Sequence, residues 1–265
     1  MNVTSIDSKK TRDVVLKIAL PVLIELLLGT LFGMIDMMML GRIKDSGIAA
    51  ASIAAVGITN QPLFIGISLV QALNVGGTAM VARYIGAKRN DKVETVVKHT
   101  IVLNLVLLVV PIFILGMLFT DKIMIFLGAQ NDTLTVGRNY FRIVMIGFIF
   151  QSFNLSISAA LRGAGDTKTP MNVNLKANSF NVVGNALLIY GLLGFPKLGV
   201  TGAGISTCLS HVVASTLLLK RLFKNNGIIH INIKNPFKFD KDIMYNLIKI
   251  GVPASLEQVA FRVGV

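Results

Sequence analysis

The sequence predicts an all-α protein that crosses a membrane several times. Apolar residues make up 53% of its 265 residues and charged residues only 15%, whereas an average soluble domain has roughly 25% charged residues. The mean hydropathy is +0.70, and the apolar residues form runs of the length that a membrane helix needs, about 20 residues. A soluble globule of this size needs a more polar surface, and a disordered chain is far less apolar.

Six complete membrane spans are expected, followed by the start of a seventh. The six apolar runs cover residues 14–40, 48–74, 93–119, 135–161, 170–193 and 200–223. Short polar or glycine-rich segments separate them. A longer polar segment follows at 224–247, and a last apolar run covers 248–265. We therefore predict a six-helix lobe over 1–223, a linker over 224–247 and the beginning of helix 7.

The net charge of +13 would suggest nucleic acid as the partner of a soluble protein. Here the Lys and Arg residues gather in the segments between the apolar runs, where they set the orientation of a membrane protein. Sixteen of them fall on the side of the N-terminus and the linker, and five on the other side. The sequence thus predicts a multi-pass protein of the cytoplasmic (inner) membrane with a cytoplasmic N-terminus. Membrane lipid is an expected partner and nucleic acid is not.

A ten-residue pattern occurs twice, 232 positions apart: LKIALPVLIE at 16–25 and IKIGVPASLE at 248–257. The matched Pro and Glu carry the signal, because neither is common inside a membrane helix. Six spans separate the copies, so both copies have the same orientation, as in the parallel repeats of some secondary transporters. We expect the chain to be one full bundle plus the start of a second, with the missing lobe or a second copy as its partner.

Asp36, in the run LFGMIDMMML at 31–40, is the first candidate for ion binding. A charged side chain in hydrocarbon is costly, so acids within spans commonly mark ion or proton sites. The alternative is an interfacial anchor near the lipid headgroups. Glu25 lies eleven residues earlier, which is close to three helical turns, so the two carboxylates share one face about 16 Å apart.

The fifth span carries a stripe of asparagines, Asn174, Asn178, Asn181 and Asn185, whose spacing places all four on one helical face. Such a stripe can coordinate a cation or line a polar cavity, or it can serve only for hydrogen bonds between helices, worth near 0.6 kcal/mol each. The predicted substrate-cavity residues are Glu25, Gln71, Asn74, Asn154 and Asn178.

The sequence contains no HExxH, GxSxG or Walker motif and no His-rich cluster, and Cys208 is its single cysteine. We therefore expect no enzymatic activity, no cofactor and no bound metal apart from a transported Na⁺ at Asp36. Without a nucleotide site, transport would have to use a gradient of Na⁺ or H⁺.

Five further features lie in order along the chain: the Pro21 to Asp36 first helix, ARYIGAKR at 82–89, RGAGDTKTP at 162–170, NVVGNALLIYG at 181–191 and GVTGAGIST at 199–207. In combination, these features resemble the multidrug and toxic compound extrusion (MATE) family of bacterial type. The resemblance implies twelve helices in two six-helix lobes around a central cleft. It also implies antiport, in which cationic or amphipathic drugs leave the cell as Na⁺ or H⁺ enters.

The resemblance also implies roles for particular residues. Asp36 would be the cation or proton site of the first lobe. Asn181 matches the first member of an Asn-x-x-x-Asp pair on the fifth helix, and Asn185 stands where the acid of that pair is expected. Glu257 matches an acid of the seventh helix that another subgroup uses.

Two other functions compete with drug export. A lipid-linked oligosaccharide or lipid flippase of the same superfamily would need several cationic side chains in its cavity to bind phosphates, whereas the predicted spans contain few bases. A membrane-embedded enzyme would need clustered catalytic residues, which the sequence lacks. Ion-coupled export of drugs is therefore the predicted function.

Overall fold

The computed structural model describes residues 8–223, 229–231 and 237–263, and this part of the chain is helical without any strand. Its α-helices are α1 (Ser8–Gly41), α2 (Ser46–Gly86), α3 (Asn90–Asn104), α4 (Val110–Leu118), α5 (Thr120–Phe126), α6 (Asn131–Gly163), α7 (Lys168–Tyr190), α8 (Val200–Leu222) and α9 (Lys241–Val263). A π-helical turn, η1 (Leu105–Val109), joins α3 to α4, and a short 3₁₀ turn, η2 (Leu192–Gly194), follows α7. The prediction of an all-α fold is confirmed.

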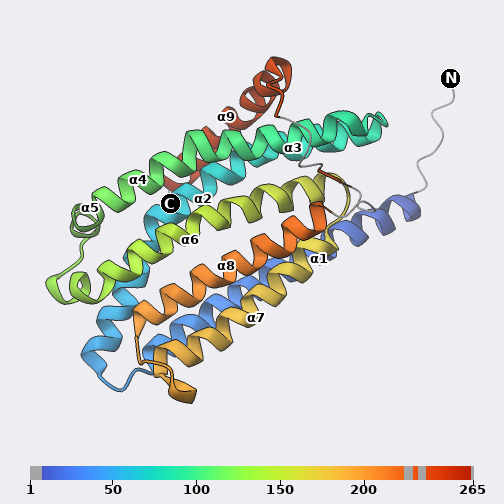
Figure 1. Ribbon diagram of the computed structural model, residues 1–265. Coiled ribbons are helices and arrows are strands. Elements are labelled where there is room, and N and C mark those ends of the chain that lie inside the picture. The colour runs from blue at the N-terminus through green and yellow to red at the C-terminus, as the bar shows by residue number, and fades with distance from the viewer. Residues whose placement is uncertain (1–7, 224–228, 232–236, 264–265) are drawn as a thin grey trace, which may run out of the picture.

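The long helices run side by side in one bundle (Figure 1). Helix α6 packs against α2 and α8, and α7 packs against α8 and α1. Helices α3 and α4 line one edge of the bundle and α1 and α7 line the opposite edge (Figure 1). Helix α9 packs against α2 and α3. The α1–α7 edge carries both intramembrane acids of the first span, Glu25 and Asp36.

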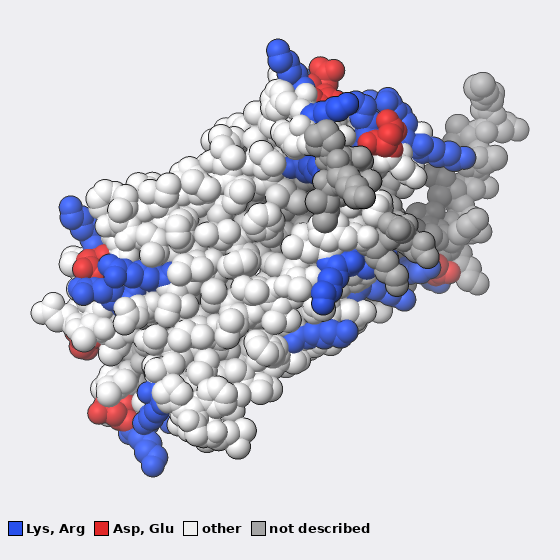
Figure 2. Space-filling model, in the orientation of Figure 1, with Lys and Arg blue, Asp and Glu red and all other residues white. Residues whose placement is uncertain are grey.

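Five helical stretches among the described residues are long and apolar enough to cross a membrane: Val15–Gly41, Ser46–Gly86, Asn90–Leu118, Asn131–Gly163 and Val200–Leu222. Helix α7 has the length but carries the asparagine stripe and Lys176, which make it too polar for this group. Charged side chains gather at the two ends of the visible face and leave an uncharged band between them (Figure 2). This pattern is the one expected of a bundle whose middle faces lipid.

The end of α2 and the start of α9 differ most from the sequence prediction. Helix α2 does not end at residue 74 but continues to Gly86. Gly76 and Gly77 lie inside it at close contacts with neighbouring helices: a Cβ on Gly77 would lie 2.7 Å from the Thr100 hydroxyl, and one on Gly76 would lie 3.1 Å from the Leu247 carbonyl oxygen. The pair therefore serves helix packing and does not end the helix.

Helix α9 begins at Lys241. The apolar run from which we predicted this helix begins seven residues later, at residue 248. Its first turn is capped by Asp240, whose Oδ1 accepts hydrogen bonds from the backbone N–H groups of Asp242 at 3.1 Å and Ile243 at 3.2 Å. Side-chain caps of this kind satisfy the free N–H groups at a helix start. Hydropathy locates only the apolar part of a helix and so misses a polar first turn.

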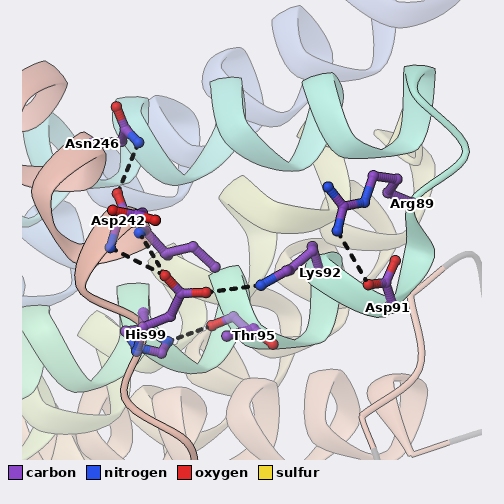
Figure 3. A network of polar contacts seen from close by, with 9 residues as sticks. Arg89, Asp91, Lys92, Thr95, His99, Asp242 and Asn246 are labelled. Carbon is purple, nitrogen blue, oxygen red and sulfur yellow. Dashed lines mark hydrogen bonds and ion pairs between the residues drawn. The ribbon is translucent and has the colours of Figure 1, made fainter.

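The segment before α9 is held against α3 by a network around His99 (Figure 3). The fully buried His99 ring lies 4.8 Å from the ring of Phe237 and 5.8 Å from that of Phe239. Its Nδ1 donates to the Thr95 carbonyl at 2.8 Å, and its Nε2 accepts from the backbone N–H of Asp240 at 2.9 Å. A carbonyl can only accept and an N–H can only donate, so this pair of bonds requires the neutral Nδ1–H tautomer.

An ion pair reinforces the same segment. Lys92 Nζ lies 2.9 Å from Asp240 Oδ2. This contact with the Lys92 ammonium holds the pKa of the Asp240 carboxyl below its usual range. The start of α9 is thus fastened to α3 by both a neutral and a charged contact.

The segment at 162–170 forms the corner between α6 and α7. Gly165 has a φ of +84°, a backbone conformation that favours glycine. Asp166 caps α7 by accepting from Thr169, with Oδ1 at 3.0 Å from the backbone nitrogen and Oδ2 at 2.7 Å from the hydroxyl, and its Oδ2 lies 3.6 Å from Arg221 Nη2. The corner therefore fixes the start of α7 and, with it, the position of the asparagine stripe.

Candidate functional site

Asp36 on α1 faces the asparagine stripe of α7. Its Oδ1 accepts a hydrogen bond from Asn185 Nδ2 at 2.7 Å. Asn185 is fully buried, and its own Oδ1 has no hydrogen-bond partner among the described residues. Because residues four apart share a helix face, Asn181 lies next to Asn185 on the side of α7 that faces Asp36.

Asn181 joins Asp36 to α8. With its amide turned so that Nδ2 faces the carboxylate, this nitrogen is 3.1 and 3.2 Å from the two oxygens of Asp36. Its Oδ1 then accepts from the backbone N–H and the hydroxyl of Thr207, at 3.1 and 3.2 Å. The Ser206 hydroxyl donates to the Asn181 backbone carbonyl at 2.8 Å.

Ser206 and Thr207 were not among the predicted site residues. Their signal was present in GVTGAGIST, where two hydroxyl residues follow a run of small residues. Small residues let α8 approach α7 closely, and the hydroxyls then come within reach of the asparagine stripe.

The Asp36 cluster, defined here as Asp36, Asn181, Asn185, Ser206 and Thr207, is rich in oxygen. Carboxylate, carboxamide and hydroxyl oxygens suit a hard cation such as Na⁺. The unpartnered Oδ1 of Asn185 fits such a ligand, because a buried polar atom without a partner is costly. No group of three or more His, Cys, Asp or Glu side chains that could hold a metal is found in the described part of the chain.

A cavity of about 790 Å³ lies between α1, α2, α6, α7 and α8. All five predicted cavity residues line it: Glu25, Gln71, Asn74, Asn154 and Asn178. Other polar residues line it as well, among them Gln151, Arg162, Asn174 and His211. The structure thus brings together residues from five helices that are distant in sequence.

The side chains that line the cavity differ in how many hydrogen bonds they already make within the protein. Asn154 donates to the His211 carbonyl at 3.2 Å and accepts from the Ser215 hydroxyl at 2.8 Å. Asn74 Oδ1 accepts a hydrogen bond from Asn104 Nδ2 at 2.8 Å. Asn104 is the last residue before the π-helical turn η1. Gln71, Gln151 and Asn178 have no side-chain hydrogen bond to another described residue. Their carboxamides are therefore available to a guest.

Among the described residues that line the cavity, Glu25 is the one acid and Arg162 is the one Lys or Arg. Glu25 Oε1 accepts from Asn174 Nδ2 at 2.5 Å and lies 3.6 Å from Arg162 Nη1. Its Oε2 is buried and has no partner within the described ranges. Asp36, in contrast, does not line the cavity.

Glu257 is not brought to the Asp36 cluster. It is exposed on α9, which packs against α2 and α3, whereas the cluster lies between α1, α7 and α8. The sequence repeat pairs Glu257 with Glu25, but within the described residues the two acids lie on different helix interfaces. Of the four predicted cation-binding residues, Asp36, Asn181 and Asn185 lie together, and the role of Glu257 stays a prediction.

Known proteins resemble this chain over most of its length. The MatE family model matches residues 21–187. The probable multidrug resistance protein YoeA of Bacillus subtilis is 28% identical over 241 residues, covering 90% of this chain and 51% of the relative. The probable multidrug resistance protein NorM of Thermotoga maritima is 30% identical over 254 residues, covering 96% of this chain and 53% of the relative. The chain thus spans about half the length of the curated relatives it matches.

Solved structures of membrane transporters also resemble this chain. An outward-facing multidrug resistance MATE family transporter of the MOP superfamily is 29% identical, with a TM-score of 0.81 over 94% of this chain and 53% of that one. A MOP superfamily transporter from Pyrococcus furiosus, also 29% identical, gives a TM-score of 0.82 with the same coverage. The family model covers more than half of the sequence, and the fold and the relatives are those of multi-pass membrane transporters. The chain therefore belongs to the MatE family.

Proposed function

We propose that this chain supplies the first lobe of an antiporter that exports cationic or amphipathic compounds in exchange for Na⁺ or H⁺. One observation carries the proposal: the same two helices, α1 and α7, build an oxygen-rich cluster around Asp36 and one wall of a cavity of about 790 Å³. Cavities of roughly 300–1,000 Å³ suit drug-sized molecules. The names of the relatives, multidrug resistance and export proteins, support the substrate class.

The coupling ion would bind at Asp36. A proton would neutralise the carboxylate, and Na⁺ would be held by the carboxylate together with amide oxygens that Asn181 and Asn185 turn toward it. A proton on one oxygen of Asp36 would weaken the N–H contact to that oxygen, and Na⁺ would require both amides to turn, so either ion would alter the contacts between α1 and α7. Exchange occurs when such a change alters the affinity of the cavity for its substrate.

The proposed orientation places the N-terminus and the linker in the cytoplasm and the chain in the cytoplasmic membrane. The central cleft of such a transporter needs a second lobe, of which α9 would be the first helix. The second lobe would come from further sequence or from a second copy of the chain. Single cysteines introduced at Asp13 and Lys238 into a Cys208→Ser background should react with a membrane-impermeant thiol reagent only after the cytoplasmic side is opened.

The lipid flippase is not favoured. Phosphate groups are typically bound by several Arg or Lys side chains, whereas the described lining of this cavity contains one, Arg162, which already faces Glu25 at 3.6 Å.

The test of the proposal is efflux of a fluorescent cationic dye from vesicles under an imposed Na⁺ or H⁺ gradient, with the second lobe present. Asp36→Asn keeps the shape of the side chain and removes its charge, so we expect normal insertion and loss of gradient-driven export. Asp13→Asn, on the exposed start of α1, is the matched control and should export like the unmodified protein. Equal rates and equal ion dependence in Asp36→Asn and the unmodified protein would show that Asp36 does not couple transport.

A further inference from the structure

Glu25 is the acid that lines the cavity, and only one of its two carboxylate oxygens has a partner among the described residues. Asn174 and Arg162 both approach Oε1 of Glu25, whereas the buried Oε2 has no partner among the described residues. An ionised carboxylate oxygen removed from water needs a donor or a cation. The geometry of Glu25 therefore leaves Oε2 without the donor or cation that it needs.

Arg162 does not fill this position. Its Nη1 lies 3.6 Å from Oε1, beyond the range of a direct hydrogen bond, and its side chain remains partly exposed. It offsets part of the charge of Glu25 through Oε1 and leaves Oε2 without a partner among the described residues.

The rest of the cavity favours an organic cation over a bare ion. Gln71 and Asn178 present carboxamides without partners among the described residues, and apolar side chains such as Val22 and Leu26 line the same space. The volume of about 790 Å³ is far larger than a desolvated Na⁺ requires. Asp36 does not line this cavity, so a cationic guest meets Glu25 as its one anionic partner in the described lining.

The spacing along the helices supports the same conclusion. Glu25 and Asp36 are eleven residues apart on α1, and their partners Asn174 and Asn185 are eleven residues apart on α7. The same acid–amide pair is therefore built twice along one interface. At Asp36, Asn181 also contacts the carboxylate and links it to Thr207 of α8. At Glu25, the acid and Asn174 both line the cavity.

We propose that Glu25 is the residue that recognises the charge of the substrate, a protonated amine that donates to Oε2 while Asn174 and Arg162 hold Oε1. This inference rests on the proposed function, because it assigns the substrate class of the same cavity.

The test uses the purified protein, with the second lobe present, in lipid nanodiscs and measures fluorescence anisotropy with two dyes: rhodamine 123, a cation with N–H donors, and Nile red, which is neutral. Empty nanodiscs supply the background. Glu25→Gln keeps an oxygen for Asn174 and removes the charge, so it should weaken rhodamine 123 binding at least tenfold and Nile red binding less than twofold. Arg162→Gln should tighten rhodamine 123 binding several-fold, a gain that misfolding does not produce. Asp13→Asn is the matched control and should leave both affinities unchanged.

Two results would overturn the inference alone: equal rhodamine 123 affinity in Glu25→Gln and the unmodified chain, or equal loss of both dyes. Failure of the unmodified chain to bind either dye would instead overturn the proposed function and the inference with it.

Discussion

The two ends of the α1–α7 interface use the same chemistry for different purposes. At one end, Asp36 is enclosed by two asparagines and by α8, and its cluster does not line the cavity. At the other, Glu25 has one asparagine and a distant arginine, and it faces the cavity. The number of amides around each acid thus separates a site suited to a small ion from a site suited to a larger guest. Three predictions test this difference.

The largest expected effect comes from removing one amide at each end. Asn181→Leu should weaken ion binding about tenfold and leave rhodamine 123 binding unchanged, whereas Asn174→Leu should do the reverse. At a Na⁺ concentration of 100 times Kd, the ion stabilises the unmodified chain by about 2.7 kcal/mol, and a tenfold weaker site reduces this to about 1.4 kcal/mol. The measurement is the rise in thermal stability on adding Na⁺ or, if H⁺ is the coupling ion, on acidification. Identical behaviour of the two variants would remove the distinction between the ends.

A smaller effect, common to both ends, should follow from Asp166→Ala. This change removes the cap of α7, and the loss of a helix cap typically costs about 1 kcal/mol. Since α7 carries both Asn174 and Asn185, ion binding and dye binding should weaken together. Chemical unfolding in nanodiscs measures the stability, with the exposed Asp13→Ala as the control, expected within about 0.5 kcal/mol of the unmodified chain. If only ion binding or only dye binding weakened, the α6–α7 corner would act on only one end of the α1–α7 interface.

The smallest effect on ion binding and dye binding should come from Lys92→Met, because Lys92 lies on α3, outside the α1–α7 interface. Lys92 lowers the pKa of the Asp240 carboxyl, so the pair stabilises the linker fully above the unfolded pKa of Asp, about 3.9, and this contribution is lost as the pH falls through the lower folded pKa. In Lys92→Met the backbone N–H of Asp240 should exchange with deuterium faster than in the unmodified chain at neutral pH, and the difference should shrink in acid. Arg89→Gln, which alters the neighbouring exposed pair with Asp91, is the control. An unchanged exchange rate would show that the His99 contact alone holds the segment.

The sequence predicted the helices and most of the cavity for a simple reason. Apolar runs of membrane length can fold only as spanning helices, and the spacing of the four asparagines fixes which face of α7 they occupy. All five predicted cavity residues line one cavity because each is a polar residue that hydrocarbon would not accept. The family prediction is confirmed by the MatE match.

The parts that the sequence did not predict depend on contacts between helices. Arg162 was assigned to a loop, but as part of the last turn of α6 it reaches Glu25. Ser206 and Thr207 join the site only because α8 packs closely on α7. Glu257 shares its local pattern with Glu25, yet the partners of an acid are set by the neighbouring helix, and α9 packs against different helices from α1.

The depth of each acid along α1 also has an electrical meaning. Helix α1 runs from Ser8 to Gly41, so Glu25 lies near its middle and Asp36 near its outer end in the proposed orientation. Moving one elementary charge through the whole membrane potential involves about 2.3 kcal/mol per 100 mV. An ion that enters from outside and stops at Asp36 crosses a small part of that field, while a cation that leaves from Glu25 crosses about half of it. The separate steps of ion entry and substrate release would thus depend on voltage to different degrees, although a complete exchange of one charge for one moves no net charge.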